Sequence, residues 1–145
     1  MRLVIQRVKS AQVEVDGKII SSIRTGLLVL AGIGKNDDGS EIDWLANKTT
    51  DLRIFEDENG KMNLNLHDIS GEILLVSQFT LYADCQKGRR PGFDQAAQPE
   101  KAKRLFDQFV LSVNALGFKA QTGIFGADMK VSLINDGPVT IILEK

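Results

Sequence analysis

Gly26-Leu27-Leu28-Val29-Leu30-Ala31-Gly32-Ile33-Gly34 is nearly all apolar, with no charged residue in nine positions. A strand with one wet face alternates apolar and polar residues, whereas a strand buried on both faces is apolar throughout. A second run of the same kind, Ile73-Leu74-Leu75-Val76, lies further along the chain. The sequence therefore predicts two strands that are buried on both faces.

Shorter strands are expected on either side of this segment. Asp16-Gly17 separates an alternating N-terminal stretch from Lys18 to Arg24, and an Asp-Gly pair between such runs favours a hairpin turn. Asp57-Glu58-Asn59-Gly60 lies between Arg53-Ile54-Phe55 and Lys61-Met62-Asn63 and predicts a second hairpin.

Two helices are expected as well. Ser40 is a candidate N-cap, with Asp43 at the capping-box position, for a helix whose apolar face contains Ile42 and Leu45. Pro99 suits the first turn of a second helix. Its apolar residues follow a 3.6-residue period until Gly117, namely Ala102, Leu105, Phe106, Phe109, Val110, Val113 and Leu116. We expect a single α+β domain, residues 1–145, in which two helices cover a β-rich sheet.

Composition limits the classes of function. The 145 residues carry a formal net charge of −1, so nucleic-acid binding needs a local basic patch. One cysteine, Cys85, and one histidine, His67, leave no basis for a zinc centre, and we expect no metal or cofactor. The N-terminus lacks signal-peptide features, and no apolar run approaches the ~20 residues of a membrane span. We expect a cytoplasmic protein without a membrane partner.

The segment Asn135-Asp136-Gly137-Pro138-Val139-Thr140 interrupts two apolar runs, Val131 to Ile134 and Ile141 to Leu143. One interpretation is a hairpin with a proline at a sheet edge. The other is a binding device made of main chain, because glycine and proline bring backbone carbonyls close to a ligand. The residues alone leave both open.

Ser77-Gln78-Phe79-Thr80 follows the second buried strand. Hydroxyls, an amide and free backbone N–H groups at a strand end can bind a carbonyl and its oxyanion, or they can satisfy local backbone. A triad would need His67 as base, oriented by Asp68, Asp84 or Asp128, with a serine or Cys85 as nucleophile. No nucleophile-elbow pattern surrounds Ser77.

Lys87, Arg89 and Arg90 cluster in a polar loop, with Phe93 nearby. Cations beside an aromatic ring suit phosphate contact and stacking on an unpaired base, although a solvated loop has the same composition. Gly32-Ile33-Gly34-Lys35 is not a phosphate-binding loop, because Val29 and Asn36 stand where that motif needs glycine and Ser/Thr. We interpret it as the exit of a strand.

These motifs together resemble the D-aminoacyl-tRNA deacylases, in that family's order and from the first strand to the last. The similar segments are Arg2 to Val8, Lys61-Met62-Asn63-Leu64-Asn65, Ser77-Gln78-Phe79-Thr80-Leu81, Gly88-Arg89-Arg90-Pro91-Gly92-Phe93, Gly126-Ala127-Asp128-Met129 and Asn135 to Thr140. One departure is Gly92, where the family commonly has serine.

The resemblance implies a homodimer with a β-barrel-like core that cleaves the ester between a D-amino acid, or glycine, and the terminal adenosine of tRNA. It implies a cis Gly137–Pro138 bond whose carbonyl oxygens reach the partner's site, hold the substrate amino group and exclude an L side chain. Arg7 would tie this segment down, rather than being a surface cation. Met129 and Asn135 would also contribute to substrate selection, and Lys87, Arg89, Arg90 and Phe93 would bind the tRNA 3′ end.

For the chemistry, backbone N–H groups around Gln78, Phe79 and Thr80 are the candidate oxyanion donors, with Ser77 beside them. The ribose 2′-OH of the substrate would activate water, and Thr80 as a nucleophile ranks second. Two other classes of function stay open: a non-catalytic tRNA-binding module built on the basic loop, and a generic esterase using His67 or Cys85.

Overall fold

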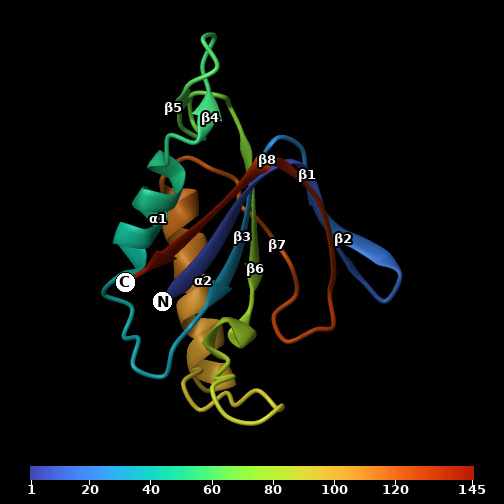
Figure 1. Ribbon diagram of the computed structural model, residues 1–145, viewed down its shortest axis with the longest axis vertical. Coiled ribbons are helices and arrows are strands. Elements are labelled where there is room, and N and C mark those ends of the chain that lie inside the picture. Colours follow the sequence, from blue (N-terminus) through green and yellow to red (C-terminus); the bar gives the residue numbers. More distant parts are fainter.

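The computed structural model describes residues 1–145. A curled sheet of barrel-like shape carries two helices packed side by side against one face, which confirms the expected α+β architecture (Figure 1). The elements are β1 (Arg2–Val15), β2 (Lys18–Ile23), β3 (Gly26–Gly32), α1 (Ile42–Asp51), β4 (Phe55–Glu56), β5 (Met62–Leu64), β6 (Glu72–Ser77), the 3₁₀ helix η1 (Phe79–Tyr82), α2 (Pro99–Ala115), β7 (Gln121–Thr122) and β8 (Lys130–Glu144).

Strand β1 organises the sheet. Its first half pairs with β3 and its second half with β2, while β8 pairs antiparallel along its other edge from Arg2 to Glu14. Strands β3, β6 and β7 are parallel neighbours, so the sheet is mixed. Both predicted hairpins form, β1–β2 at Asp16-Gly17 and β4–β5 around residues 57–60.

Strands β3 and β6 are buried on both faces, as predicted. Successive side chains of a strand point to opposite faces. Leu27 and Val29 therefore join the main core beneath the helices, whereas Leu28 joins a second cluster inside the curl of the sheet. The same alternation places Leu75 in the first cluster and Leu74 in the second. This double burial fixes the strand ends at which the candidate site lies.

Helix α2 begins at Pro99, as predicted, and buries Leu105, Phe106, Phe109 and Val113 against the sheet and α1. Neither helix has the length and apolar character needed to cross a membrane.

The expected cap of α1 is wrong. The helix begins after Glu41 without a side-chain cap, so Ser40 stands one residue before the N-cap position, in a turn where its N–H donates to the Asp38 carboxylate at 2.9 Å. The Glu41 carboxylate accepts a hydrogen bond from the Met1 ammonium at 3.2 Å instead. Glu41 thus ties the start of α1 to the start of β1.

The hairpin interpretation of residues 135–140 is also wrong. Both flanking runs belong to β8 and pair with the same strand, β1. Between the pairs Gln6–Thr140 and Val8–Asn135, β1 advances by two residues and β8 by five, so residues 136–139 bulge out of the ladder. The Gly137–Pro138 peptide bond within this bulge is cis.

Candidate active site at the carboxyl ends of two buried strands

A pocket of about 540 Å³ opens where β3 and β6 end. Ser77, Gln78 and Phe79 line one side, Phe93 comes from the loop before α2, and Phe125 to Met129 close the opposite side. Two-thirds of the lining residues, 12 of 18, are hydrophobic. The structure therefore brings together five of the predicted site residues, Ser77, Gln78, Phe79, Phe93 and Met129.

The backbone at the pocket wall is set by the end of the β-ladder. Ser77 pairs with Ala31, and the Gln78 N–H donates to the Ala31 carbonyl at 2.8 Å. That donor is occupied and unsuited to an oxyanion. The first N–H groups of a helical turn have no partner within it, so those of Phe79 and Thr80 remain as candidates. The Thr80 hydroxyl accepts a hydrogen bond from the Gln78 side-chain amide.

The bulge of β8 is held by Arg7. This residue is only 4% exposed, so the alternative of a surface cation is wrong. Its Nε donates to the Asp136 carbonyl at 3.1 Å, and its Nη1 donates to the Ile54 carbonyl at 2.6 Å. Gly137 has a φ of 120°, in a region that favours glycine, and is exposed together with Pro138.

Residues Gly137 and Pro138 do not line the pocket of their own chain. Arg7 pairs with Leu27, whereas Ser77 pairs with Ala31, four residues further along β3. At about 3.3 Å per residue, these two rows of the sheet lie roughly 13 Å apart. The predicted chiral-selection residues Arg7, Asn135, Gly137 and Pro138 thus form a group separate from the pocket, and only Met129 lies in it.

Asn135 closes the base of the bulge. Its Nδ2 donates to the Thr140 hydroxyl across the bulge at 3.3 Å. Its Oδ1 is buried and has no hydrogen-bond partner.

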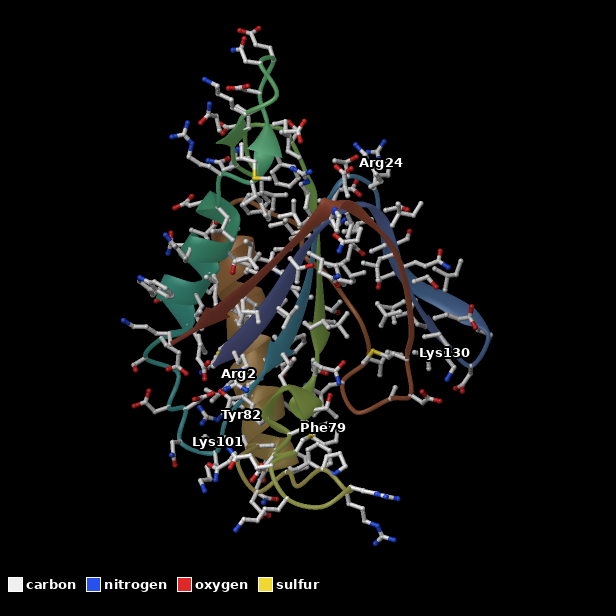
Figure 2. All side chains as sticks on the ribbon, in the orientation of Figure 1. Arg2, Arg24, Phe79, Tyr82, Lys101 and Lys130 are labelled. Atoms are coloured by element: carbon white, nitrogen blue, oxygen red, sulfur yellow. The ribbon has the colours of Figure 1, made fainter.

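The predicted basic loop borders the pocket. Lys87, Arg89 and Arg90 are exposed and make no ion pair with a carboxylate. Reciprocal backbone hydrogen bonds of 2.8 Å between Asp84 and Gly92 close the loop. The Phe93 ring contacts Phe79 edge to face, with centroids 5.0 Å apart. Figure 2 shows Phe79 beside this loop, at the lower end of the molecule.

The chain is similar to known proteins over its full length. Residues 4–144 match the family model described as D-Tyr-tRNA(Tyr) deacylase. A protein of Geotalea uraniireducens named D-aminoacyl-tRNA deacylase is 60% identical over 144 residues, covering 99% of this chain and 93% of that relative. One of the same name from Thermosipho africanus is 58% identical, covering 99% and 97%.

This chain belongs to the D-Tyr-tRNA(Tyr) deacylase family. The resemblance seen in the sequence is confirmed, and membership in the deacylase family makes the protein an ester hydrolase that acts on aminoacyl-tRNA. The alternative of a non-catalytic tRNA-binding module does not fit membership in a family of hydrolases.

Solved structures agree with the family's fold. A structure named c-Myc DNA Unwinding Element Binding Protein has a TM-score of 0.93 and 41% identity, covering 100% of this chain and 99% of that one. A probable eukaryotic D-amino acid tRNA deacylase has a TM-score of 0.84 at 17% identity, covering 98% and 97%, and shows the shared fold.

The pocket does not contain the alternative triad. His67 is exposed before β6 begins and packs edge to face on Phe118, whereas Ser77 ends that strand. Ser77 lies five positions after Glu72 along β6, a distance of roughly 16 Å. His67 therefore cannot serve as a base at Ser77, and Cys85 is exposed and does not line the pocket. The generic esterase interpretation is wrong on this geometry.

Asp128 is the one ionisable side chain that lines the pocket. It is exposed and pairs with Lys130 at 2.9 Å. The hydrogen bond to Asp128 raises the pKa of Lys130. The Asp128 carboxylate is thus engaged by Lys130 at the exposed rim, and no histidine lines the pocket.

Proposed function

We propose that the protein hydrolyses the ester between a D-amino acid, or glycine, and the terminal adenosine of tRNA, and that it rejects L-aminoacyl esters. The observation that carries this proposal is the composition of the pocket. It offers main-chain donors and apolar walls at a strand end, a basic loop at its rim, and no nucleophile–base pair.

The oxyanion of the tetrahedral intermediate is held by the backbone N–H groups of Phe79 and Thr80. Preorganised donors aimed at developing charge usually contribute the largest single part of the rate enhancement. The Gln78 N–H does not take part, because it is bonded to Ala31. Main-chain donors of this kind do not depend on the protonation state of any side chain.

The attacking water is activated by the 2′-OH of the terminal ribose, next to the ester. The exposed and ion-paired Asp128 is not needed as a base. Thr80 is not a nucleophile in this scheme, because its hydroxyl accepts the Gln78 amide and has no adjacent base.

The chirality of the substrate is read by Gly137 and Pro138 of a second copy of the chain in a homodimer. A D residue presents hydrogen where an L residue presents its side chain, so a rigid main-chain wall excludes the L form whatever the D side chain is. A side-chain pocket would discriminate mainly by size, and only modestly. The exposure of both residues and their distance from their own pocket support an assignment to the partner's site.

Phosphates of the tRNA 3′ end are contacted by Lys87, Arg89 and Arg90, and an unpaired base stacks on Phe93. These cations are exposed and free of carboxylate partners, as phosphate binding requires. The cytoplasm, where aminoacylated tRNA is used, is the expected place of action.

The test is release of amino acid from D-tyrosyl-, L-tyrosyl- and glycyl-tRNA. We expect turnover of the D and glycyl esters and none of the L ester. Binding of all three without release would instead support a tRNA-binding module, and equal turnover of D and L esters would refute the chiral assignment.

Two changes, one in the substrate and one in the protein, separate the mechanisms. Substrate ending in 2′-deoxyadenosine should bind with little change and react at least 100-fold more slowly, consistent with general-base contributions of about 10²–10⁴-fold. Thr80→Ala should retain most of the turnover. Loss of turnover in Thr80→Ala, together with an acyl group trapped on Thr80 in the parent, would establish covalent catalysis.

A further inference from the structure

We infer that Arg2 is a positioning residue of the active site, because its guanidinium fixes η1, the short helix that carries Phe79 and Thr80. This inference rests on the proposed function, since it concerns the same pocket. Figure 2 shows Arg2 and Tyr82 next to one another, with Phe79 beside them at the lower end of the molecule.

The interactions of Arg2 converge on the end of η1. Its Nη1 donates to the Leu81 carbonyl at 2.5 Å, and its Nη2 donates to the Glu144 carboxylate at 2.7 Å. The guanidinium carbon lies 4.9 Å from the centre of the Tyr82 ring. An arginine that bonds one of the last carbonyls of a helix satisfies a group that the helix itself leaves free.

Few other interactions fix η1 in place. It has four residues, none of them buried, and no side-chain cap at its start. Beyond its own turn, the segment is connected to the sheet by the Gln78 N–H and to the basic loop by the Phe79–Phe93 pair. Removing the Arg2 side chain would leave the C-terminal end of η1 attached by the packing of Leu81 and Tyr82 on the glycine backbone of β3, with no side-chain hydrogen bond to its last carbonyls.

Tyr82 provides the second half of the same clamp. A Cβ on Gly34 would lie 2.8 Å from the Tyr82 ring and one on Gly32 would lie 3.3 Å from it, so the ring packs directly on the backbone at the exit of β3. The Tyr82 hydroxyl approaches the Asp37 carboxylate at 3.5 Å. The ring thus contacts both the glycine backbone and the Arg2 guanidinium.

The base of the Arg2 side chain is rigid. Arg2 pairs with Gly32 on one edge of β1 and with Glu144 on the other, inside the six-stranded sheet. Displacing a reacting group by about 1 Å can cost 100-fold in rate. A side chain anchored in the sheet and bonded to Leu81 would prevent such a displacement of the Phe79 and Thr80 N–H groups.

The experiment compares four variants of the full-length protein: Arg2→Ala, Arg2→Lys, Glu144→Gln and Arg24→Ala. Arg24 is the matched control, because it also pairs with a strand carboxylate, that of Glu72 at 3.3 Å, yet lies at the opposite end of the molecule (Figure 2). Arg2→Lys retains a donor for Leu81 but cannot also hold Glu144 in the same geometry. If Arg2→Ala does not fold, Arg2→Met, which keeps the length and apolar stem, replaces it.

With D-tyrosyl-tRNA, we expect kcat of Arg2→Ala to fall about 10- to 100-fold while KM changes less than twofold. Arg2→Lys should recover at least part of kcat, and Glu144→Gln and Arg24→Ala should stay within twofold of the parent. A rise in KM at constant kcat, a kcat like that of Arg24→Ala, or no recovery in Arg2→Lys would each overturn the inference.

A second measurement does not depend on activity. Amide hydrogen exchange follows the Leu81 and Ala83 N–H groups, which bond the carbonyls of Gln78 and Thr80 in the native turn. In Arg2→Ala these amides should exchange at least tenfold faster, while those of β3 stay unchanged; equal rates in both proteins would refute the clamp. If the parent did not hydrolyse D-tyrosyl-tRNA, the proposed function would fail while this measurement still tested Arg2.

Discussion

The Arg7 guanidinium fills the space that a side chain at Gly137 would need, with Nη2 only 2.9 Å from the position of a Cβ there. The methyl Cγ2 of Val139 lies 2.8 Å from the same position. The shape of the bulge in β8 therefore depends on one residue without a side chain and on one buried cation.

Gly137→Ala should reduce D-aminoacyl-tRNA turnover and lower the melting temperature, because it adds both a clash with Arg7 and an unfavourable positive φ. Gly60→Ala is the matched control: Gly60 also has a positive φ, of 72°, but has no atom within 4 Å of a Cβ. An alanine at positive φ alone lowers the free energy of unfolding by about 1 kcal/mol, which lowers the melting temperature by roughly 2–4 °C in a chain of this size. Equal melting temperatures and activities for the two variants would contradict the argument.

Arg7→Lys should destabilise the protein by about 1–3 kcal/mol, because a lysine cannot bond both the Asp136 and Ile54 carbonyls and leaves one buried acceptor unsatisfied. Discrimination between D and L esters should weaken as well. Lys9→Ala, which removes the exposed pair to Asp136 at 3.2 Å, should change stability by no more than about 1 kcal/mol. Urea unfolding and the ratio of D to L turnover measure the two effects.

Mixed dimers test whether the bulge acts in the partner's site. Ala127→Trp should fill the pocket that Ala127 lines, and Gly137→Ala should impair the bulge, so each homodimer should have little activity. In a purified heterodimer, one chain has an intact bulge and the other an intact pocket. These two meet in one site if the bulge acts across the interface, and they never meet if it acts within its own chain. We expect about half of the parent activity. An inactive heterodimer would mean that the bulge serves its own chain.

The basic loop should give a salt-dependent KM. Arg89→Gln combined with Arg90→Gln should reduce the slope of log KM against log salt by up to about 0.7–0.9 for each phosphate that the variant no longer neutralises. The control combines Lys61→Gln, on the β5 side of the β4–β5 hairpin, with Lys119→Gln, beyond α2, which changes the net charge equally. A slope that changes equally in both double variants would indicate general charge and not the loop.

Tyr82 should make the protein less stable in alkali. Burial raises the pKa of Tyr82 to about 12, and the nearby Asp37 carboxylate acts in the same direction. An unfolded tyrosine titrates near pH 10, so between about pH 10 and 12 the folded state binds the extra proton and stability falls as pH rises. Tyr82→Phe should remove this part of the fall. Tyr82 is the single tyrosine, so phenolate absorbance reports on it alone.

Much of the fold follows from local patterns. An uninterrupted apolar run predicts either a strand buried on both faces or a buried helix, and the flanking glycines favour the strand. Because side chains alternate along a strand, Leu27 and Leu28 then point into different cores. The period of α2 and its initial proline specify that helix in the same way. In these cases the residues that decide the structure are neighbours in sequence.

The predictions that fail involve distant partners or competing side chains. Asp136-Gly137 has the chemistry of a hairpin turn, but β1 is long enough to pair with both flanking halves of β8 at once. Ser40 has the chemistry of an N-cap, but the helix starts one residue later, after Glu41, whose carboxylate binds the Met1 ammonium at the start of β1. The role of Arg2 has no signal in the sequence, because its partners Leu81 and Glu144 lie 79 and 142 positions away.

The pairing of β8 also makes the length of the bulge independent of the register of the sheet. Residues on either side of positions 136–139 are each aligned by their own pairs with β1, through Asn135 and Thr140. A residue gained or lost within the bulge need not slip either half, a change that would turn every side chain to the wrong face. The segment can therefore change in length and reach while both halves of β8 keep their register with β1.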